Sequence, residues 1–217
     1  MNGMNCMPTL FLTVIWGVVS VFWVRLQTYM SAKKRSDLLY QQANTDPLTG
    51  LFNRNALNEH IYAVLADSAL KNAAVMIIDL DNFKSVNDNF GHLYGDGVLK
   101  EISREIRERV RETDTIGRIG GDEFVVFMEN YGDESVLEKR ADAFCRALRK
   151  YYEEDDVECT ISGSIGIACF PRDGKTYDEL LGKADQALYY IKKSIKMIMH
   201  FIVTRFARSI FILFYQK

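Results

Sequence analysis

The longest hydrophobic run lies near the start of the chain. Residues 7–24 carry no charged side chain and are mostly Leu, Phe, Val, Ile and Trp. Such a run is close to the shortest helix that spans a bilayer, about 17 residues, and it is apolar on every face, unlike a helix on a soluble domain. Basic residues follow the run and none precedes it, which favours a retained anchor over a cleaved signal peptide. We therefore expect a single-pass transmembrane anchor over residues 1–24, with the rest of the chain on the cytoplasmic side of the inner membrane.

A polar segment with scattered Leu and Tyr follows, over residues 25–44, and contains neither Gly nor Pro. It predicts a helical linker between the anchor and a main domain over residues 45–194. In that domain, apolar spacings of three and four predict four helices, over 54–70, 95–111, 134–152 and 177–193. Short apolar runs predict four strands, over 73–80, 115–119, 124–128 and 159–169.

The order of these elements interleaves helices with strands, but the middle two strands follow each other as a hairpin. This order predicts an α+β sandwich, with helices around a mostly antiparallel central sheet. The formal net charge of −2 gives no general reason to expect nucleic-acid binding. The four cysteines lack metal-binding spacing, so we expect reduced thiols.

Two acidic residues end the first apolar strand. Asp79 and Asp81 are two residues apart, so both side chains point to the same face of the sheet. Unpaired charge is costly to bury, and a magnesium ion, which prefers carboxylate oxygens, is one reason to place acids there. A strand that simply reaches solvent is the other interpretation.

A second acidic pair follows two glycines between the hairpin strands. Gly120 and Gly121 permit a tight turn and close approach of a ligand to the backbone, and Asp122 and Glu123 come next. An ordinary Gly-Gly turn is the simpler interpretation. It does not explain why these acids occur together with Asp79 at another strand end. Three such carboxylates suit a two-metal site for displacement at phosphorus.

These residues resemble the GGDEF family of diguanylate cyclases. Residues 120–124 spell Gly-Gly-Asp-Glu-Phe, and four further motifs of the family match: D-x-L-T-G-L-x-N-R at 46–54, D-x-D-x-F-K-x-x-N-D at 79–88, F-G-H-x-x-G-D at 90–96 and A-D-x-A-L-Y at 184–189. The resemblance covers most of residues 45–194. It implies a palm-like fold, similar to that of nucleotidyl cyclases and ferredoxin-like domains.

The resemblance also implies the reaction. Two GTP molecules condense into cyclic di-GMP and two pyrophosphates, each 3′-hydroxyl attacking the other α-phosphate, in a homodimer with twofold symmetry. Asp79, Glu123 and the Leu80 carbonyl would bind Mg²⁺ or Mn²⁺. Asp122 would help deprotonate the 3′-hydroxyl or bind metal, and the division of these roles between Asp122 and Glu123 stays open.

The implied GTP contacts come from several segments. Asn87 and Asp96 would read guanine, and His92 would lie close to the nucleotide. Lys84 and Lys192 would neutralise the phosphates, and the Gly120-Gly121 turn would lie against the nucleotide. The alternative for the residues near position 90 is simple helix capping.

A candidate feedback site precedes the hairpin. Arg111 and Asp114 form an R-x-x-D that resembles the family's inhibitory site for cyclic di-GMP. A salt bridge between residues i and i+3 of a helix is the other interpretation.

The family pattern breaks after Lys193. Lys196 stands where an arginine of the family would contact phosphate, and a lysine cannot make the bidentate contact. Residues 195–217 form an atypical apolar and basic tail, for which three interpretations stay open: an altered or frame-shifted end, a closing strand, or a membrane contact.

We therefore predict a diguanylate cyclase with GTP as substrate and no nucleic-acid partner. The alternative is a catalytically weak or silent GGDEF module that binds GTP or cyclic di-GMP and signals through a partner.

Overall fold

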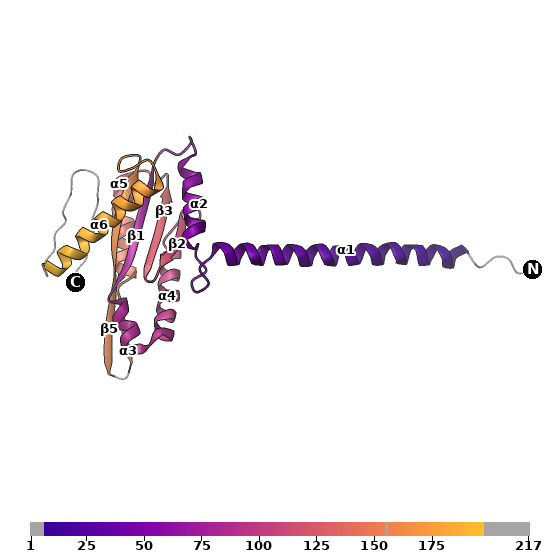
Figure 1. The fold of residues 1–217 in the computed structure, drawn as a ribbon, viewed down its shortest axis with the longest axis horizontal. Coiled ribbons are helices and arrows are strands. Elements are labelled where there is room, and N and C mark those ends of the chain that lie inside the picture. The colour runs from indigo at the N-terminus through magenta and orange to yellow at the C-terminus, as the bar shows by residue number, and fades with distance from the viewer. Residues whose placement is uncertain (1–6, 155, 198–217) are drawn as a thin grey trace, which may run out of the picture. The chain divides into compact units, whose positions relative to one another are not determined.

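The computed structural model describes the backbone of residues 7–154 and 156–197 and the side chains of residues 16–154 and 156–193. Contacts divide the chain into two compact units, which meet between Ala43 and Asn44. Helix α1 (Met7–Asn44) is continuous through the predicted anchor and linker (Figure 1). Residues 25–44 belong to this helix.

The transmembrane span predicted at residues 7–24 is not supported. Among the residues that the structure describes, no helix is long and apolar enough to cross a membrane. Only the second part of the apolar run, from residue 16 onward, has described side chains, and a span needs about 20 apolar residues. Residues 7–15 of the predicted span lie outside the described side chains.

The second unit is built on one five-stranded sheet in the order β2-β3-β1-β5-β4. All four neighbouring pairs are antiparallel, which confirms the predicted α+β class. The strands are β1 (Ala73–Asp81), β2 (Thr115–Gly120), β3 (Glu123–Glu129), β4 (Lys150–Glu154) and β5 (Val157–Phe170).

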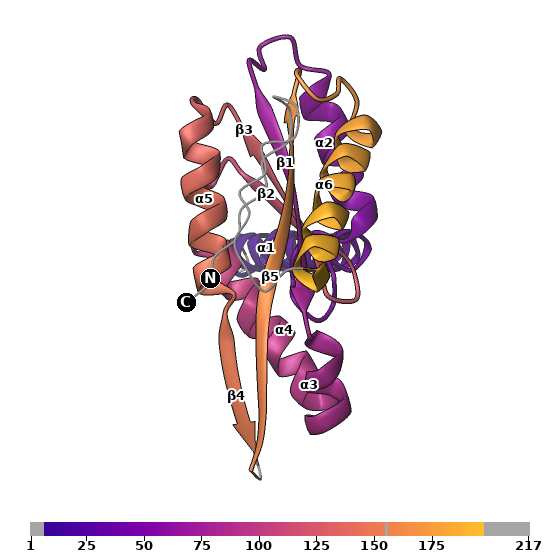
Figure 2. The same ribbon diagram turned by 90° about the vertical axis from the view of Figure 1, so that its left-hand side faces the viewer.

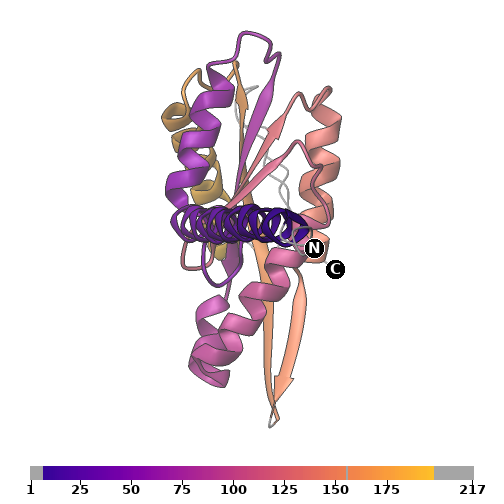
Figure 3. The ribbon, with the colours of Figure 1, turned by 90° about the vertical axis from the view of Figure 1, so that its right-hand side faces the viewer.

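Helices cover both faces of the sheet (Figure 2). Helices α2 (Arg54–Leu65) and α6 (Tyr177–Met197) pack on one face, and α4 (His92–Arg107) and α5 (Glu134–Ala147) pack on the other, with the short α3 (Phe83–Phe90) beside α4. Figure 3 shows the same layers from the opposite side. The result is a helix–sheet–helix sandwich with a hydrophobic cluster on each side of the sheet.

Strand β1 supplies both clusters because its side chains alternate. Ala74, Met76 and Ile78 belong to the cluster under α4 and α5, and Val75 and Ile77 belong to the cluster under α2 and α6. This alternation directs every odd-numbered residue of β1, up to the strand end, toward the α2/α6 face.

Two elements were not expected from the sequence. Helix α3 buries only Phe83 and Val86, too few apolar positions to give a clear period. Strand β4 begins within the predicted helix 134–152 and extends past its end, because α5 ends at Ala147 and the chain then pairs with β5. The two tyrosines of β4 favour a strand. Pairing with the long strand β5 outweighs the helical spacing of apolar residues in this segment.

Candidate active site

The acidic residues gather on the α2/α6 face because of strand register. Asp79 of β1 lies directly opposite Glu123 of β3, and Asp79 and Asp81 share one face of their strand. The backbone N–H of Leu80 donates to the carbonyl of Asp122 at 3.3 Å, which ties the hairpin turn to the end of β1. The structure thus brings Asp79, Asp122 and Glu123 to one edge of the sheet, in neighbouring positions.

The hairpin turn between β2 and β3 occurs at the predicted glycines. Gly121 has φ +47°, a conformation that residues with a Cβ rarely adopt. Two arginines hold the carbonyls of this turn. Arg118 donates to the Gly121 carbonyl from Nε at 2.9 Å and from Nη2 at 2.7 Å, and Arg54 Nε donates to the Ile119 carbonyl at 2.9 Å.

Arg118 also reaches the turn that follows α1. Its Nη1 lies 3.1 Å from Asp46 Oδ1, and both side chains are largely buried. Asp46 accepts from the Thr49 hydroxyl at 2.6 Å as well. The pair joins the first residue of the Asp46–Arg54 motif to the glycine turn, and sequence reasoning assigned no role to either partner. Their separation of 72 positions in the sequence explains why no local pattern showed the contact.

Lys192 enters the site from α6. Its ammonium forms an ion pair with Asp79. The position follows from the close crossing of α6 over β5 at Gly166, where an added Cβ would lie 2.0 Å from the Ala184 carbonyl oxygen. Lys192 stands two turns beyond Ala184 on the same helix face. The packing of this helix face on the sheet therefore places Lys192 next to Asp79 at the end of β1.

Asp81 is the second acidic residue that β1 directs to this face. The Ser162 hydroxyl donates to its Oδ2 at 3.0 Å, and the Ser164 hydroxyl donates to the same oxygen at 2.8 Å. Both serines lie on β5, in register with β1. The D-x-D spacing signalled this residue, but sequence reasoning gave it no place in the site, and its serine partners are too distant in sequence to predict.

Burial, and after it neighbouring negative charge, raises the pKa of three carboxyl groups at this site. Burial, followed by the charge of Asp79, raises the pKa of Asp122, and burial with the charges of Asp79 and Asp122 raises the pKa of Glu123. Burial also raises the pKa of Asp81, although the two serine hydroxyls act in the opposite direction. A concentration of negative charge of this kind suits a cation.

These residues suit a divalent metal by the type of their donor atoms. Within the described part of the chain, no three Asp, Glu, His or Cys side chains converge closely enough to hold an ion. The donors that are present, two facing carboxylates and a third beside them, are the hard oxygens that Mg²⁺ prefers. The carboxylates therefore provide suitable ligands for a divalent cation. In this structure, Asp79 forms an ion pair with Lys192.

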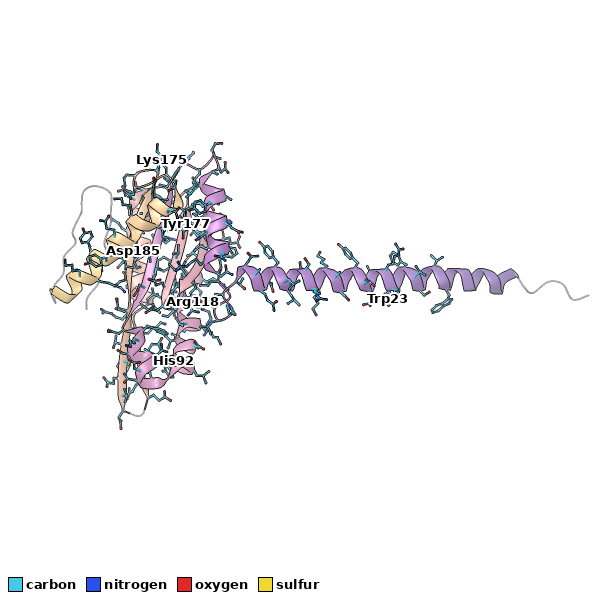
Figure 4. All side chains as sticks on the ribbon, viewed as in Figure 1. Trp23, His92, Arg118, Lys175, Tyr177 and Asp185 are labelled. Atoms are coloured by element: carbon cyan, nitrogen blue, oxygen red, sulfur yellow. The ribbon has the colours of Figure 1, made fainter. Side chains whose placement is uncertain are left out.

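The residues expected to read guanine lie at the junction of α3 and α4. Asn87 is half-buried on α3, and Asp96 and His92 are exposed near the start of α4. An added Cβ on Gly95 would lie 2.0 Å from Asn87 Oδ1, so Asn87 packs directly against the α4 backbone next to Asp96. His92, labelled in Figure 4, lies at this end of the domain. Lys84 is exposed on α3.

Arg111 and Asp114 line a cavity of about 710 Å³. They lie in a turn after α4, where the Arg111 backbone N–H donates to Asp114 Oδ2 at 2.9 Å. In the described part of the chain, no ion pair joins their side chains, and the buried Asp114 Oδ1 has no hydrogen-bond partner. Arg107, His60 and Phe52 lie in the same wall. A buried carboxylate oxygen without a donor favours a ligand with N–H groups.

The predicted contact at Lys196 falls partly outside the structure. Its backbone belongs to α6, but its side chain lies outside the described residues, and so does the tail from residue 198.

Comparisons with known proteins agree on one family. Residues 43–197 match the family model described as "Diguanylate cyclase, GGDEF domain". MucR of Pseudomonas aeruginosa, named a bifunctional diguanylate cyclase/cyclic di-GMP phosphodiesterase, is 38% identical over 194 residues, which are 85% of this chain and 28% of MucR. The chain therefore spans less than a third of that relative.

Two solved structures share the fold. A sensory box/GGDEF family protein from Caulobacter crescentus has a TM-score of 0.64 at 37% identity, over 70% of this chain and 99% of its own. The GGDEF domain of DgcB from Caulobacter crescentus, solved in complex with c-di-GMP, has a TM-score of 0.61 at 25% identity, over 70% of this chain and 91% of its own.

Proposed function

Because the chain belongs to the GGDEF family of diguanylate cyclases, we propose that it condenses two molecules of GTP into cyclic di-GMP and two pyrophosphates. The observation that carries the proposal is the register of Asp79 against Glu123, with Asp122 in the adjoining turn and Lys192 over them. A bound divalent cation would supply charge for the α-phosphate and the attacking oxygen. Asp79, Glu123 and the Leu80 carbonyl would hold it.

The residues of the chain provide the remaining functions. Asp122 accepts the proton of the 3′-hydroxyl, and the raised pKa of its carboxyl makes it a better base than an exposed aspartate. Asn87 and Asp96 bind the guanine edge, His92 lies beside the nucleotide, and Lys84 and Lys192 bind phosphate. The Gly120-Gly121 turn admits the nucleotide next to the backbone. One chain holds one GTP, so a twofold homodimer completes the reaction.

The test is direct. The full chain is incubated with GTP and Mg²⁺, and cyclic di-GMP is measured by chromatography. We expect product from the native chain and a loss of at least about a hundredfold with Asp79→Asn or Glu123→Gln, as for removal of one electrostatic group. Asp88→Asn, an exposed residue of the same motif, is the matched control and should retain activity.

A silent binding module is the second candidate. The observation that favours it is the absence, among the described side chains, of three converged metal-binding groups. GTP binding without any cyclic di-GMP product would support this candidate and overturn the first.

The cavity at Arg111 and Asp114 is proposed to bind the product as a feedback inhibitor. Support comes from the unpaired Asp114 Oδ1, which can accept from guanine N–H groups, and from the adjacent arginine, which can donate to the O6/N7 edge. Arg111→Ala should abolish inhibition by added cyclic di-GMP, whereas Arg104→Ala, an exposed arginine outside the cavity wall, should not. Inhibition that is unchanged in Arg111→Ala would contradict this site.

The location at the inner membrane stays a prediction. Cell fractionation followed by detection of the full chain in the membrane or the supernatant tests it.

A further inference from the structure

The ion pair between Lys192 and Asp79 places a side-chain ammonium on the carboxylate proposed to bind metal. The carboxylate of Asp79 is mostly buried, with 13% of the side chain exposed, and the lysine is 38% exposed. The charge of Lys192 also reaches Asp81 and Asp122, where it acts to lower the pKa. Lys192 therefore neutralises part of the negative charge that a divalent cation would otherwise meet.

The backbone of Lys192 is held by the packing of α6, and its charge lies at the end of a long side chain. Ala184 and Leu188 fix the α6 backbone against Gly166, with distances to an added Cβ of 2.0 Å and 2.7 Å. Beyond them, four flexible methylene groups carry the ammonium. The partial exposure of the side chain leaves it a path to solvent, so the ammonium can leave Asp79 without any movement of the helix.

We infer that Lys192 is a tethered counter-ion that occupies Asp79 until a divalent cation displaces it, and that the displaced ammonium then binds the phosphates of GTP. The inference rests on the proposed role of Asp79 in metal binding. It adds a coupling: the cation must compete with Lys192 for Asp79, and the nucleotide gains a phosphate ligand only after the cation has bound. Metal and nucleotide thereby increase each other's affinity through one side chain.

The first experiment measures Mn²⁺ binding to the full chain without nucleotide, by electron paramagnetic resonance of the unbound ion. Lys192→Met removes the competitor, so we expect Mn²⁺ to bind more tightly by on the order of fivefold, the value of one partly exposed ion pair. Lys193→Met is the matched control, since Lys193 is the exposed neighbour on the same helix. It removes the same charge and should change the affinity by less than about twofold.

The second experiment measures the affinity for α,β-methylene GTP, which cannot react at the α-phosphate, with and without Mn²⁺. The native chain should gain more affinity from Mn²⁺ than Lys192→Met does, because only the native chain releases a lysine to the phosphates. Lys192→Gln, which keeps a polar group, provides a second variant, and thermal unfolding shows whether each variant is folded.

The outcomes distinguish the role inferred for Lys192 from the proposed metal-binding role of Asp79. Unchanged or weaker Mn²⁺ binding in folded Lys192→Met and Lys192→Gln would overturn the inference, and so would an equal gain in Lys193→Met. If Asp79→Asn leaves Mn²⁺ binding unchanged, the metal role of Asp79 itself fails. Loss of binding in Asp79→Asn together with no gain in Lys192→Met would overturn the tethered counter-ion alone.

Discussion

Single glycines in this domain differ sharply in what surrounds them. A Cβ on Gly95 would lie 2.0 Å from Asn87 Oδ1, whereas a Cβ on Gly97, in the same helix, would have nothing within 4 Å. The difference makes the two positions a matched pair for testing whether Asn87 contacts the nucleotide.

Gly95→Ala is expected to displace the Asn87 amide and to raise KM for GTP by about five- to tenfold, the value of one hydrogen bond. Gly97→Ala should leave KM unchanged and should raise the free energy of unfolding by up to about 1 kcal/mol, through the higher helix propensity of Ala. Steady-state kinetics and urea unfolding of both variants check this. Equal KM values for the two variants would mean that Asn87 does not bind the base.

At the scale of elements, the Arg118–Asp46 pair joins the turn after α1 to the β2–β3 hairpin. Burial acts to raise the pKa of Asp46, but hydrogen bonds from Thr49 and Arg118 outweigh it, so the pKa is lowered. A lowered pKa in the folded state stabilises the protein above the ordinary carboxyl value, and the contribution is lost as the pH falls through the lowered value.

Asp46→Asn is therefore expected to lower the free energy of unfolding at pH 7 by about 1–3 kcal/mol, the value of hydrogen bonds to a charged group. The difference from the native chain should shrink as the pH falls below 3.8, the ordinary value for Asp. Urea unfolding across this pH range measures it. Glu59→Gln, an exposed acid on α2, should show no such difference, and a pH-independent loss in Asp46→Asn would rule out the ionic contribution.

The contact of α6 with β5 gives a second prediction for the elements. An alanine at Gly166 would press on the Ala184 carbonyl oxygen and the Leu188 backbone nitrogen, neither of which can rotate away. Gly166→Ala should cost about 1–3 kcal/mol through overpacking and should reduce activity, because Lys192 moves with α6. Gly182→Ala, in the same helix with open space around it, is the control. Thermal unfolding and cyclase assays compare them, and wild-type behaviour of Gly166→Ala would refute this account of how Lys192 is placed.

The parts of the site that the sequence predicts are local ones. The D-x-D spacing places Asp79 and Asp81 on one face because strands have a period of two, and the glycines predict the turn that carries Asp122. Register between strands decides the rest: no local pattern indicates that Glu123 lies opposite Asp79 or that Ser162 and Ser164 hold Asp81. Helix α3 was missed because only two of its residues are buried.

At the scale of the whole molecule, the second unit has its own core on both faces of the sheet. A chain that begins at Asn44 should therefore unfold cooperatively, with a midpoint within a few degrees of that of the full chain, as calorimetry can show. If α1 promotes the proposed homodimer, the shortened chain should also make cyclic di-GMP at a rate that depends more steeply on protein concentration. A shortened chain that fails to fold would show that the second unit depends on α1.

The alternating side chains of β1 limit how this domain can change in length. Inserting one residue in β1 before Ile78 would direct Asp79 into the hydrophobic cluster beneath α4 and α5. It would also direct Ile78 to the face that carries the carboxylates. Glu153 and Glu158, at the far tip of the β4–β5 hairpin, are paired and exposed, so lengthening that tip disturbs neither layer. An engineer who wishes to graft a sensor or a tag into this domain should therefore choose the hairpin tip and leave β1 untouched.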